Sequence, residues 1–210
     1  HTGLRLAHGE MLRRLGAADW NTDQGVLIGD LRAHLALGAK HLEHEEAHIH
    51  EAMARRRPDL METLEGEHAH HRARFAMVEA QIASLETGSN ADRPMLGRAV
   101  YLAMSQLVAE DLAHMHHEET VVWPGLCAAF TDEEMQAMEM AIISALAPEE
   151  VIAFMRLMIP AMNRAERTGL LTGMKAGAPP EAFAAVLDLA ARPTLDSAEW
   201  EHLVVAGIAG

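Results

Sequence analysis

The sequence predicts an all-helical protein, an up-down-up-down four-helix bundle followed by a C-terminal helical extension. Three observations lead to this prediction. Of the 210 residues 50% are hydrophobic but only 4% are aromatic, and the helix-favouring residues alanine, leucine, methionine and glutamate abound. Hydrophobic residues recur at helical spacing nearly throughout. Short stretches rich in glycine, proline, asparagine and aspartate separate four long periodic segments.

The first two helices are predicted on either side of the turn-rich segment 16–25, GAADWNTDQG. Before this segment, residues three or four apart form one face of a helix: Leu4, His8, Met11 and Leu15. After it, a long second helix is predicted from about residue 23 to residue 57. That helix ends at Pro58, because the proline ring opposes continuation.

The third and fourth helices are predicted over residues 59–86 and 94–122, with the segment TGSNADRP between them. The third presents an apolar face formed by Phe75, Val78, Ile82 and Leu85. The fourth presents a face that mixes apolar and acidic residues: Met104, Val108, Asp111, Met115, Glu118 and Val122. Long helices joined by short breaks are typical of an antiparallel bundle.

The last part of the chain is predicted to contain shorter helices than the first part. Residues 131–210 contain shorter helical segments that are interrupted by prolines, and Thr131 with Glu134 and Asp196 with Glu199 have the spacing of helix N-terminal caps. We therefore predict two domains, a bundle over residues 1–130 and a helical extension over residues 131–210 that packs on it. The extension could bind a protein partner or a second copy of the chain.

Charge and cysteine content exclude several classes of protein. The chain has 17 Lys and Arg against 31 Asp and Glu, a net charge of −14, which disfavours nucleic acid and anionic membranes as partners. No apolar run approaches the ~20 residues that span a bilayer. Cys127 is the single cysteine, so neither an intramolecular disulfide nor a thiolate metal site is expected. A cytoplasmic protein fits these features best.

A histidine-rich motif occurs twice in the sequence. Of the 14 histidines, all but His202 lie within residues 1–117. The segment KHLEHEE (40–46) aligns with AHMHHEE (113–119), and each copy contains an HxxxE pair, His41 with Glu45 and His114 with Glu118. Residues four apart share one helix face, about 5–6 Å from each other. A solvated charged face has no need for such a repeat, so we predict metal ligands.

The lengths of the predicted helices place further histidines at the same levels. His1 and His41 both lie 20 residues from Asn21, the centre of the first turn, whereas His8 misses that level by roughly 10 Å. His68 and His114 are 22 and 24 residues from the centre of the second turn. The chain thus resembles a duplicated hairpin in which six ligands converge on two metal ions: His1, His41, Glu45, His68, His114 and Glu118. Imidazoles and carboxylates together suit iron, manganese or zinc.

These motifs resemble those of the hemerythrin-like (HHE cation-binding) domain family. The resemblance covers residues 1–126 and depends on His1, HLEHEE (41–46), EH (67–68) and HMHHEETVVWP (114–124). It implies a four-helix bundle around a non-haem centre of two iron ions, with zinc or manganese as alternative metals. The HxxxE pair at His114 resembles the bacterial members of the family. For these the resemblance implies a small ligand such as dioxygen, nitric oxide or peroxide.

Other polar residues near these motifs have competing interpretations. His71 lies one turn from His68 and could replace or join it as a ligand. Asp111 could accept a hydrogen bond from an imidazole. Three histidines are predicted to be buried at other levels: His8, His34 and His48. The remaining neighbours are predicted to face solvent: His44, Glu46, His50, His70, His116 and His117.

Three functions remain open at the level of the sequence. The first is a di-iron protein that binds or senses a small ligand, including oxygen binding. The second is a di-iron oxidase or peroxidase, although no substrate-sized polar constellation is evident. The third is a structural or interaction protein in which the metal holds the bundle together and the C-terminal extension binds a partner.

Overall fold

A computed structural model describes residues 1–210, and it is all-helical, with no β-strand. None of the helices is both long enough and apolar enough to cross a membrane. The chain divides into two compact units. The first contains residues 8–144, and the second contains residues 1–7 and 145–210. The predicted division at residue 130 thus differs from the division between these units, because residues 131–144 group with the first unit.

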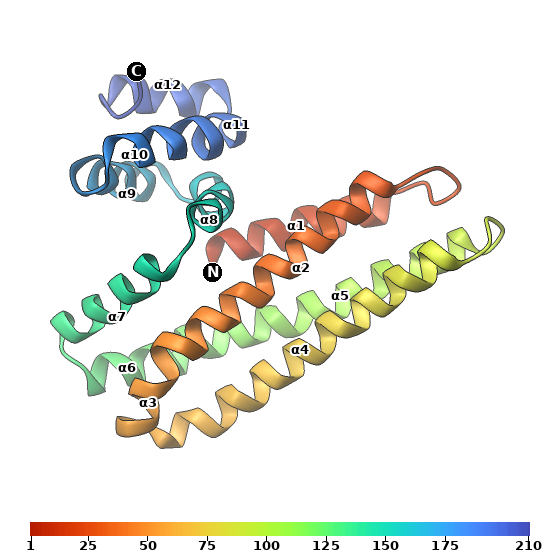
Figure 1. Ribbon diagram of the computed structural model, residues 1–210, viewed down its shortest axis with the longest axis horizontal. Coiled ribbons are helices and arrows are strands. Elements are labelled where there is room, and N and C mark those ends of the chain that lie inside the picture. Colours follow the sequence, from red (N-terminus) through yellow and green to blue (C-terminus); the bar gives the residue numbers. More distant parts are fainter. The chain divides into compact units, whose positions relative to one another are not determined.

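The first unit contains the long helices (Figure 1). α4 packs along α5 over most of their lengths, and α2 packs against α4. Pro58 ends the preceding helix as predicted, and it also serves as the first residue of α4, where its missing N–H costs nothing. The helices are α1 (Thr2–Ala17), with its residues from His8 onward in this unit, α2 (Gly25–Glu45), α3 (Glu51–Arg56), α4 (Pro58–Thr87), α5 (Arg93–His117), α6 (Trp123–Ala129) and α7 (Asp132–Ala145).

Two apolar clusters hold these helices together. The larger one lies towards the turns at residues 18–24 and 88–92, and it is built from α1, α2, α4 and α5; its members include Met11, Leu15, Leu31, Leu35, Val78, Ile82, Leu85, Met104 and Val108. Gly97 permits close approach there, because an added Cβ would lie 2.1 Å from the Trp20 ring. The smaller cluster lies at the other ends of the helices and contains Met53, Met61, Leu64, Val122 and Leu126.

A π-helical turn interrupts the regular helix at each HxxxE motif. The turn η1 (Glu46–His50) begins directly after Glu45, and the turn η2 (Glu118–Val122) begins at Glu118. A π turn accommodates an extra residue and so rotates the helix that follows it. His50 is buried as a result, which shows that the prediction of a solvent-facing His50 was wrong. The repeat seen in the sequence therefore extends to the backbone.

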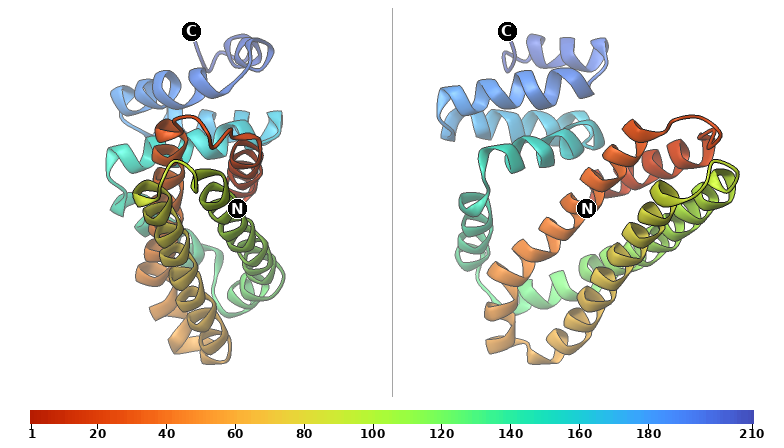
Figure 2. Two further views of the ribbon diagram at one scale, coloured as in Figure 1. Left: turned by 90° about the vertical axis from the view of Figure 1, so that its right-hand side faces the viewer. Right: turned by 45° about the vertical axis from the view of Figure 1, so that its right-hand side comes forward.

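The second unit is a group of short helices with its own core (Figure 2). Its apolar cluster includes Ile159, Leu171, Phe183, Val186 and Leu203. The buried Arg167 donates hydrogen bonds to the carbonyl oxygens of Ile159 and Met162 and pairs with Glu199. The elements are α8 (Pro148–Ala161), α9 (Arg164–Gly177), α10 (Pro180–Val186), η3 (Leu187–Ala191), α11 (Arg192–Thr194) and α12 (Ser197–Val205).

The predicted helix caps are present in both units. Thr131 and Glu134 form reciprocal hydrogen bonds between side chain and backbone at the start of α7. The Asp196 carboxylate accepts a hydrogen bond of 2.8 Å from the backbone N–H of Glu199 at the start of α12. Gly3 explains why the first residues group with the second unit, since a Cβ there would lie 2.9 Å from the backbone of Leu157.

Candidate metal centre

A layer of histidines and glutamates separates the two apolar clusters of the first unit. Along α4 it lies between Leu64 and Val78, and along α5 and η2 it lies between Val108 and Val122. The inward-facing nitrogen and oxygen atoms of this layer are buried, so they must pair with one another or bind something else.

Four side chains from separate helical segments meet in this layer. Potential ligand atoms of Glu45, His68, His114 and Glu118 all lie within 4.8 Å of one another. His68 and His114 are 0% and 3% exposed, and Glu118 is 8% exposed. Two imidazoles and two carboxylates at this separation could hold one metal ion.

The two imidazoles are fixed from the outside. Nδ1 of His68 lies 3.1 Å from Glu46 Oε1, and Nδ1 of His114 lies 2.8 Å from Glu67 Oε2. Because an ionised carboxylate can only accept, each Nδ1 must donate, and each neutral ring then has a lone pair on Nε2. Neither Nε2 has a hydrogen-bond partner. Carboxylates that orient imidazoles in this way are typical of protein metal sites.

Glu45 presents its two oxygens to different histidines. Its Oε1 lies 3.2 Å from His41 Nε2, and its Oε2 lies 3.7 Å from His68 Nε2. The second oxygen is buried without a hydrogen bond. Burial, followed by the negative charge of Glu118, raises the pKa of Glu45 well above its usual value. A bound cation would offset both effects.

Burial also keeps the imidazole of His68 available as a ligand. It lowers the pKa of His68 to about 4, so this ring is neutral near pH 7. Metals bind neutral imidazole, and no proton has to leave before His68 can coordinate.

The first unit thus brings together five of the six predicted ligands: Glu45, His68, His114 and Glu118, with His41 beside Glu45. His1 precedes α1 and belongs to the second unit, so its role stays a prediction.

His71 is buried close to the cluster but is not one of its four members. Its ring centre lies 4.7 Å from that of His114, and its Nε2 lies 3.4 Å from Asp111 Oδ1. The ring of His50 lies 4.9 Å from that of His68. Both rings form part of the wall around the cluster.

Two carboxylates that contact the imidazoles of the candidate site were not among the predicted ligands: Glu46 and Glu67. Glu46 was predicted to face solvent, but it accepts a hydrogen bond from His68 and pairs with Arg72. Glu67 accepts from both His114 and His117. Each contact joins two helices, so no spacing within a single helix could indicate it. The match of Glu46 with Glu119 in the repeat was the one available signal for Glu46.

A second polar group lies in the first unit, next to the larger apolar cluster. We call His8, His34 and Asp111 the histidine–aspartate network. His8 Nε2 lies 2.6 Å from Asp111 Oδ2, and His8 Nδ1 lies 2.9 Å from His34 Nε2. Asp111 therefore does accept from an imidazole, but that imidazole is His8 rather than a member of the metal cluster.

The remaining histidines lie outside the cluster. His116 and His70 are exposed as predicted, and His70 Nε2 lies 2.9 Å from Glu110. Three others are partly buried: His44, His48 and His117.

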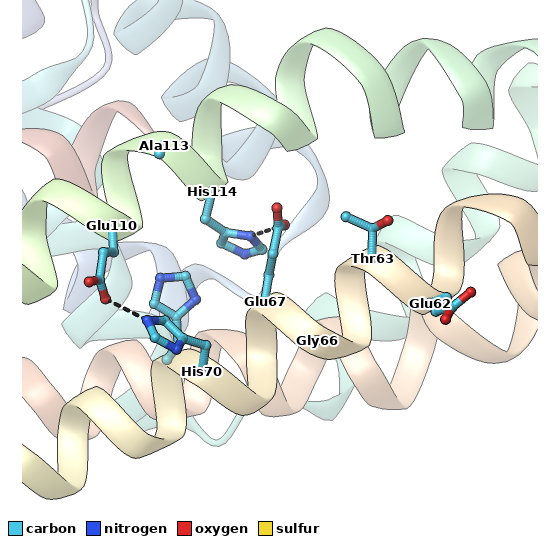
Figure 3. A pocket seen from close by; sticks show the side chains of 9 residues that line it. Glu62, Thr63, Gly66, Glu67, His70, Glu110, Ala113 and His114 are labelled. Carbon is cyan, nitrogen blue, oxygen red and sulfur yellow. Dashed lines mark hydrogen bonds and ion pairs between the residues drawn. The ribbon is translucent and has the colours of Figure 1, made fainter.

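A cleft of about 440 Å³ lies beside the cluster, where α4 and α5 face each other. Figure 3 shows Glu67 of α4 directed at His114 of α5, and His70 directed at Glu110. His114 thus has one edge towards the cluster and the other towards this cleft.

Comparison with protein-family models, with curated proteins and with solved structures finds no match to the chain. What the cluster does must therefore be inferred from its own geometry.

Proposed function

We propose that the chain is a hemerythrin-like, non-haem di-iron protein that binds or senses a small ligand such as dioxygen, nitric oxide or peroxide. One observation carries the proposal. Nε2 of His68, Nε2 of His114 and Oε2 of Glu45 are buried without hydrogen bonds, while each imidazole is held from the other side by a carboxylate. Buried polar atoms that lack partners are costly, and a metal ion would supply the missing partner.

The position of Glu45 supports two ions rather than one. Its Oε2 lies 3.7 Å from His68 Nε2, and its Oε1 lies 3.2 Å from His41 Nε2. Glu45, with His41 beside it, could thus serve a second ion as well as the first, and His1 stays a predicted ligand of that ion. The donors are nitrogen and oxygen only, which suits iron, with manganese or zinc as alternatives.

For the fold, we propose that α1, α2, α4 and α5 form the four-helix bundle of this family. All four contribute to one apolar cluster. The two π turns, which directly follow α2 and α5, support the duplicated hairpin.

In such a protein the bound ions would supply an open coordination position and accessible redox states. The residues of this chain would do the rest. Glu46 and Glu67 hold the imidazole planes in place, and the apolar residues on both sides restrict water.

Metal analysis and absorption spectroscopy test the proposal. Purified protein should contain about two iron ions per chain. The spectrum of the anaerobically reduced protein should change when dioxygen or nitric oxide is added. Fewer than one transition-metal ion per chain would overturn the proposal.

The same experiment separates the competing functions. Steady turnover of peroxide or of an organic reductant, abolished in Glu118→Ala, would identify an oxidase or peroxidase. The metal has a structural role if its removal lowers the thermal stability and if neither dioxygen nor nitric oxide changes the absorption spectrum.

A further inference from the structure

The cleft between α4 and α5 extends from solvent to the residues around the metal cluster. Its outer lining is exposed and includes Glu62, Gly66 and Ala113. Its inner lining includes His71 and His114, which are 2% and 3% exposed. A single concave surface therefore connects bulk water to a side chain of the cluster.

The chain keeps this cleft open with a residue that has no side chain. Gly66 lies inside α4, where glycine costs up to about 1 kcal/mol relative to alanine. No packing contact requires it, because a Cβ added there would meet no atom within 4 Å. A large side chain at this position would instead enter the open space of the cleft.

The charges of the cleft favour a cation. Three carboxylates line it, those of Glu62, Glu67 and Glu110. Glu110 is neutralised by Arg74, whose guanidinium donates hydrogen bonds of 2.6 and 2.8 Å to it. Glu67 accepts from imidazoles only, and Glu62 makes no ion pair with Lys or Arg. The outer part of the cleft thus carries net negative charge.

His71 indicates what the cleft would bind. Its side chain is 3% exposed and lines the cleft, and its Nδ1 has no hydrogen-bond partner. Its Nε2 has only the 3.4 Å contact with Asp111. A buried imidazole that lacks hydrogen-bond partners and lines an acidic cleft has the chemistry to bind a divalent cation.

We propose that this cleft is the route by which a divalent metal cation reaches the cluster. Glu62 and Glu67 attract the hydrated ion, and His71 binds it transiently before it passes His114. This inference assumes that the cluster of the proposed function takes up metal. Beyond the proposed function, the inference says how the metal ion reaches the site and which residues favour a cation over an anion.

Loading of the metal-free protein with Co²⁺, followed by stopped-flow absorption, tests the route. In Gly66→Phe the loading rate should fall at least about fivefold, while the final number of ions bound stays that of the unsubstituted protein. Gly66→Ala adds only a methyl group and should load within about twofold of the unsubstituted rate. Gly29→Phe is a matched control, because Gly29 is an exposed glycine of α2 with the same open surroundings.

A second variant tests the charge without adding bulk. Glu62→Gln should slow loading about threefold at low salt, and the difference should shrink as added salt screens the carboxylate. If Gly66→Phe and Glu62→Gln both load metal at the unsubstituted rate, the proposed route is wrong, but the proposed metal site is not contradicted. Failure of the unsubstituted protein to bind Co²⁺, Fe²⁺ or Zn²⁺ at all would overturn both the cluster and the route.

Discussion

The metal cluster and the histidine–aspartate network are both buried groups of imidazoles and carboxylates in the same unit, yet they differ in how their atoms are paired. In the network, both nitrogens of His8 have partners, at 2.6 and 2.9 Å. In the cluster, Nδ1 of His68 and of His114 has a hydrogen-bond partner, whereas Nε2 of each has none. Histidine content alone therefore does not mark a metal site. The proposal of a metal site depends instead on the inward atoms that have no hydrogen-bond partner.

The pKa values of the buried acids show the same contrast. Burial by itself would raise the pKa of Asp111, but the hydrogen bond from His8 and the charges of His8, His71 and His114 together lower it. Burial and the charge of Glu118 both raise the pKa of Glu45. The carboxylate of the network thus has an imidazole hydrogen-bonded to it, whereas Glu45 of the cluster keeps a buried oxygen without a hydrogen bond.

The largest expected effect is the loss of metal from the cluster. Glu118→Ala should weaken metal affinity by more than about 100-fold, because it removes one of the two carboxylates that would neutralise the ion. Titration against a competing chelator measures this loss. Glu119→Ala is the matched control, since Glu119 is the next residue and is exposed. Equal affinity of the two variants would contradict the assignment of Glu118.

The next largest effect is expected from the histidine–aspartate network. A substitution there should lower the stability of the protein but leave metal binding unchanged. Asp111→Ala leaves the buried Nε2 of His8 without its acceptor, which should lower the free energy of unfolding by about 2 to 3 kcal/mol. Urea denaturation of the metal-free protein gives this value. Asp30→Ala, which breaks an exposed pair with Arg14, should cost less than about 1 kcal/mol. Loss of metal binding in Asp111→Ala would show that the two groups are one site.

A smaller effect is expected from the carboxylates behind the imidazoles. Glu67→Gln keeps an oxygen that can accept from His114 but removes the charge, so metal affinity should fall about tenfold. Isothermal titration calorimetry measures the affinity directly. Glu43→Gln changes an exposed glutamate of α2 and should have no effect. Unchanged affinity in Glu67→Gln would mean that its contact with His114 is only structural.

The smallest effect concerns the pH dependence of stability. Burial lowers the pKa of His34 to about 4, while the unfolded chain binds this proton near 6.5. Above pH 6.5 the neutral His34 does not reduce the free energy of unfolding. As the pH falls from 6.5 towards 4, the unfolded chain binds the proton and the folded chain does not, so the free energy of unfolding decreases. His34→Gln should reduce the loss of unfolding free energy between pH 7 and pH 5 by about 1 kcal/mol. Denaturant titrations at both pH values measure it, and a parallel shift at both would contradict the assigned pKa.

Much of this architecture could be predicted from the sequence, because it depends on spacing within one helix. The apolar stripe from Met11 to Leu15, the helix stop at Pro58 and the HxxxE pairs are of this kind. The contacts of Glu46 and Glu67 could not be predicted, because they depend on how neighbouring helices align. The burial of His50 was missed because the π turn changes the spacing on which the prediction relied.

The two π turns have a consequence for insertions and deletions. Removing one residue from η1 would restore regular helical hydrogen bonding, but it would rotate everything that follows by about 100°. Met53 would then turn away from the smaller apolar cluster, although no chemically important side chain had been deleted. The number of residues in η1 is therefore as constrained as the identity of a ligand residue.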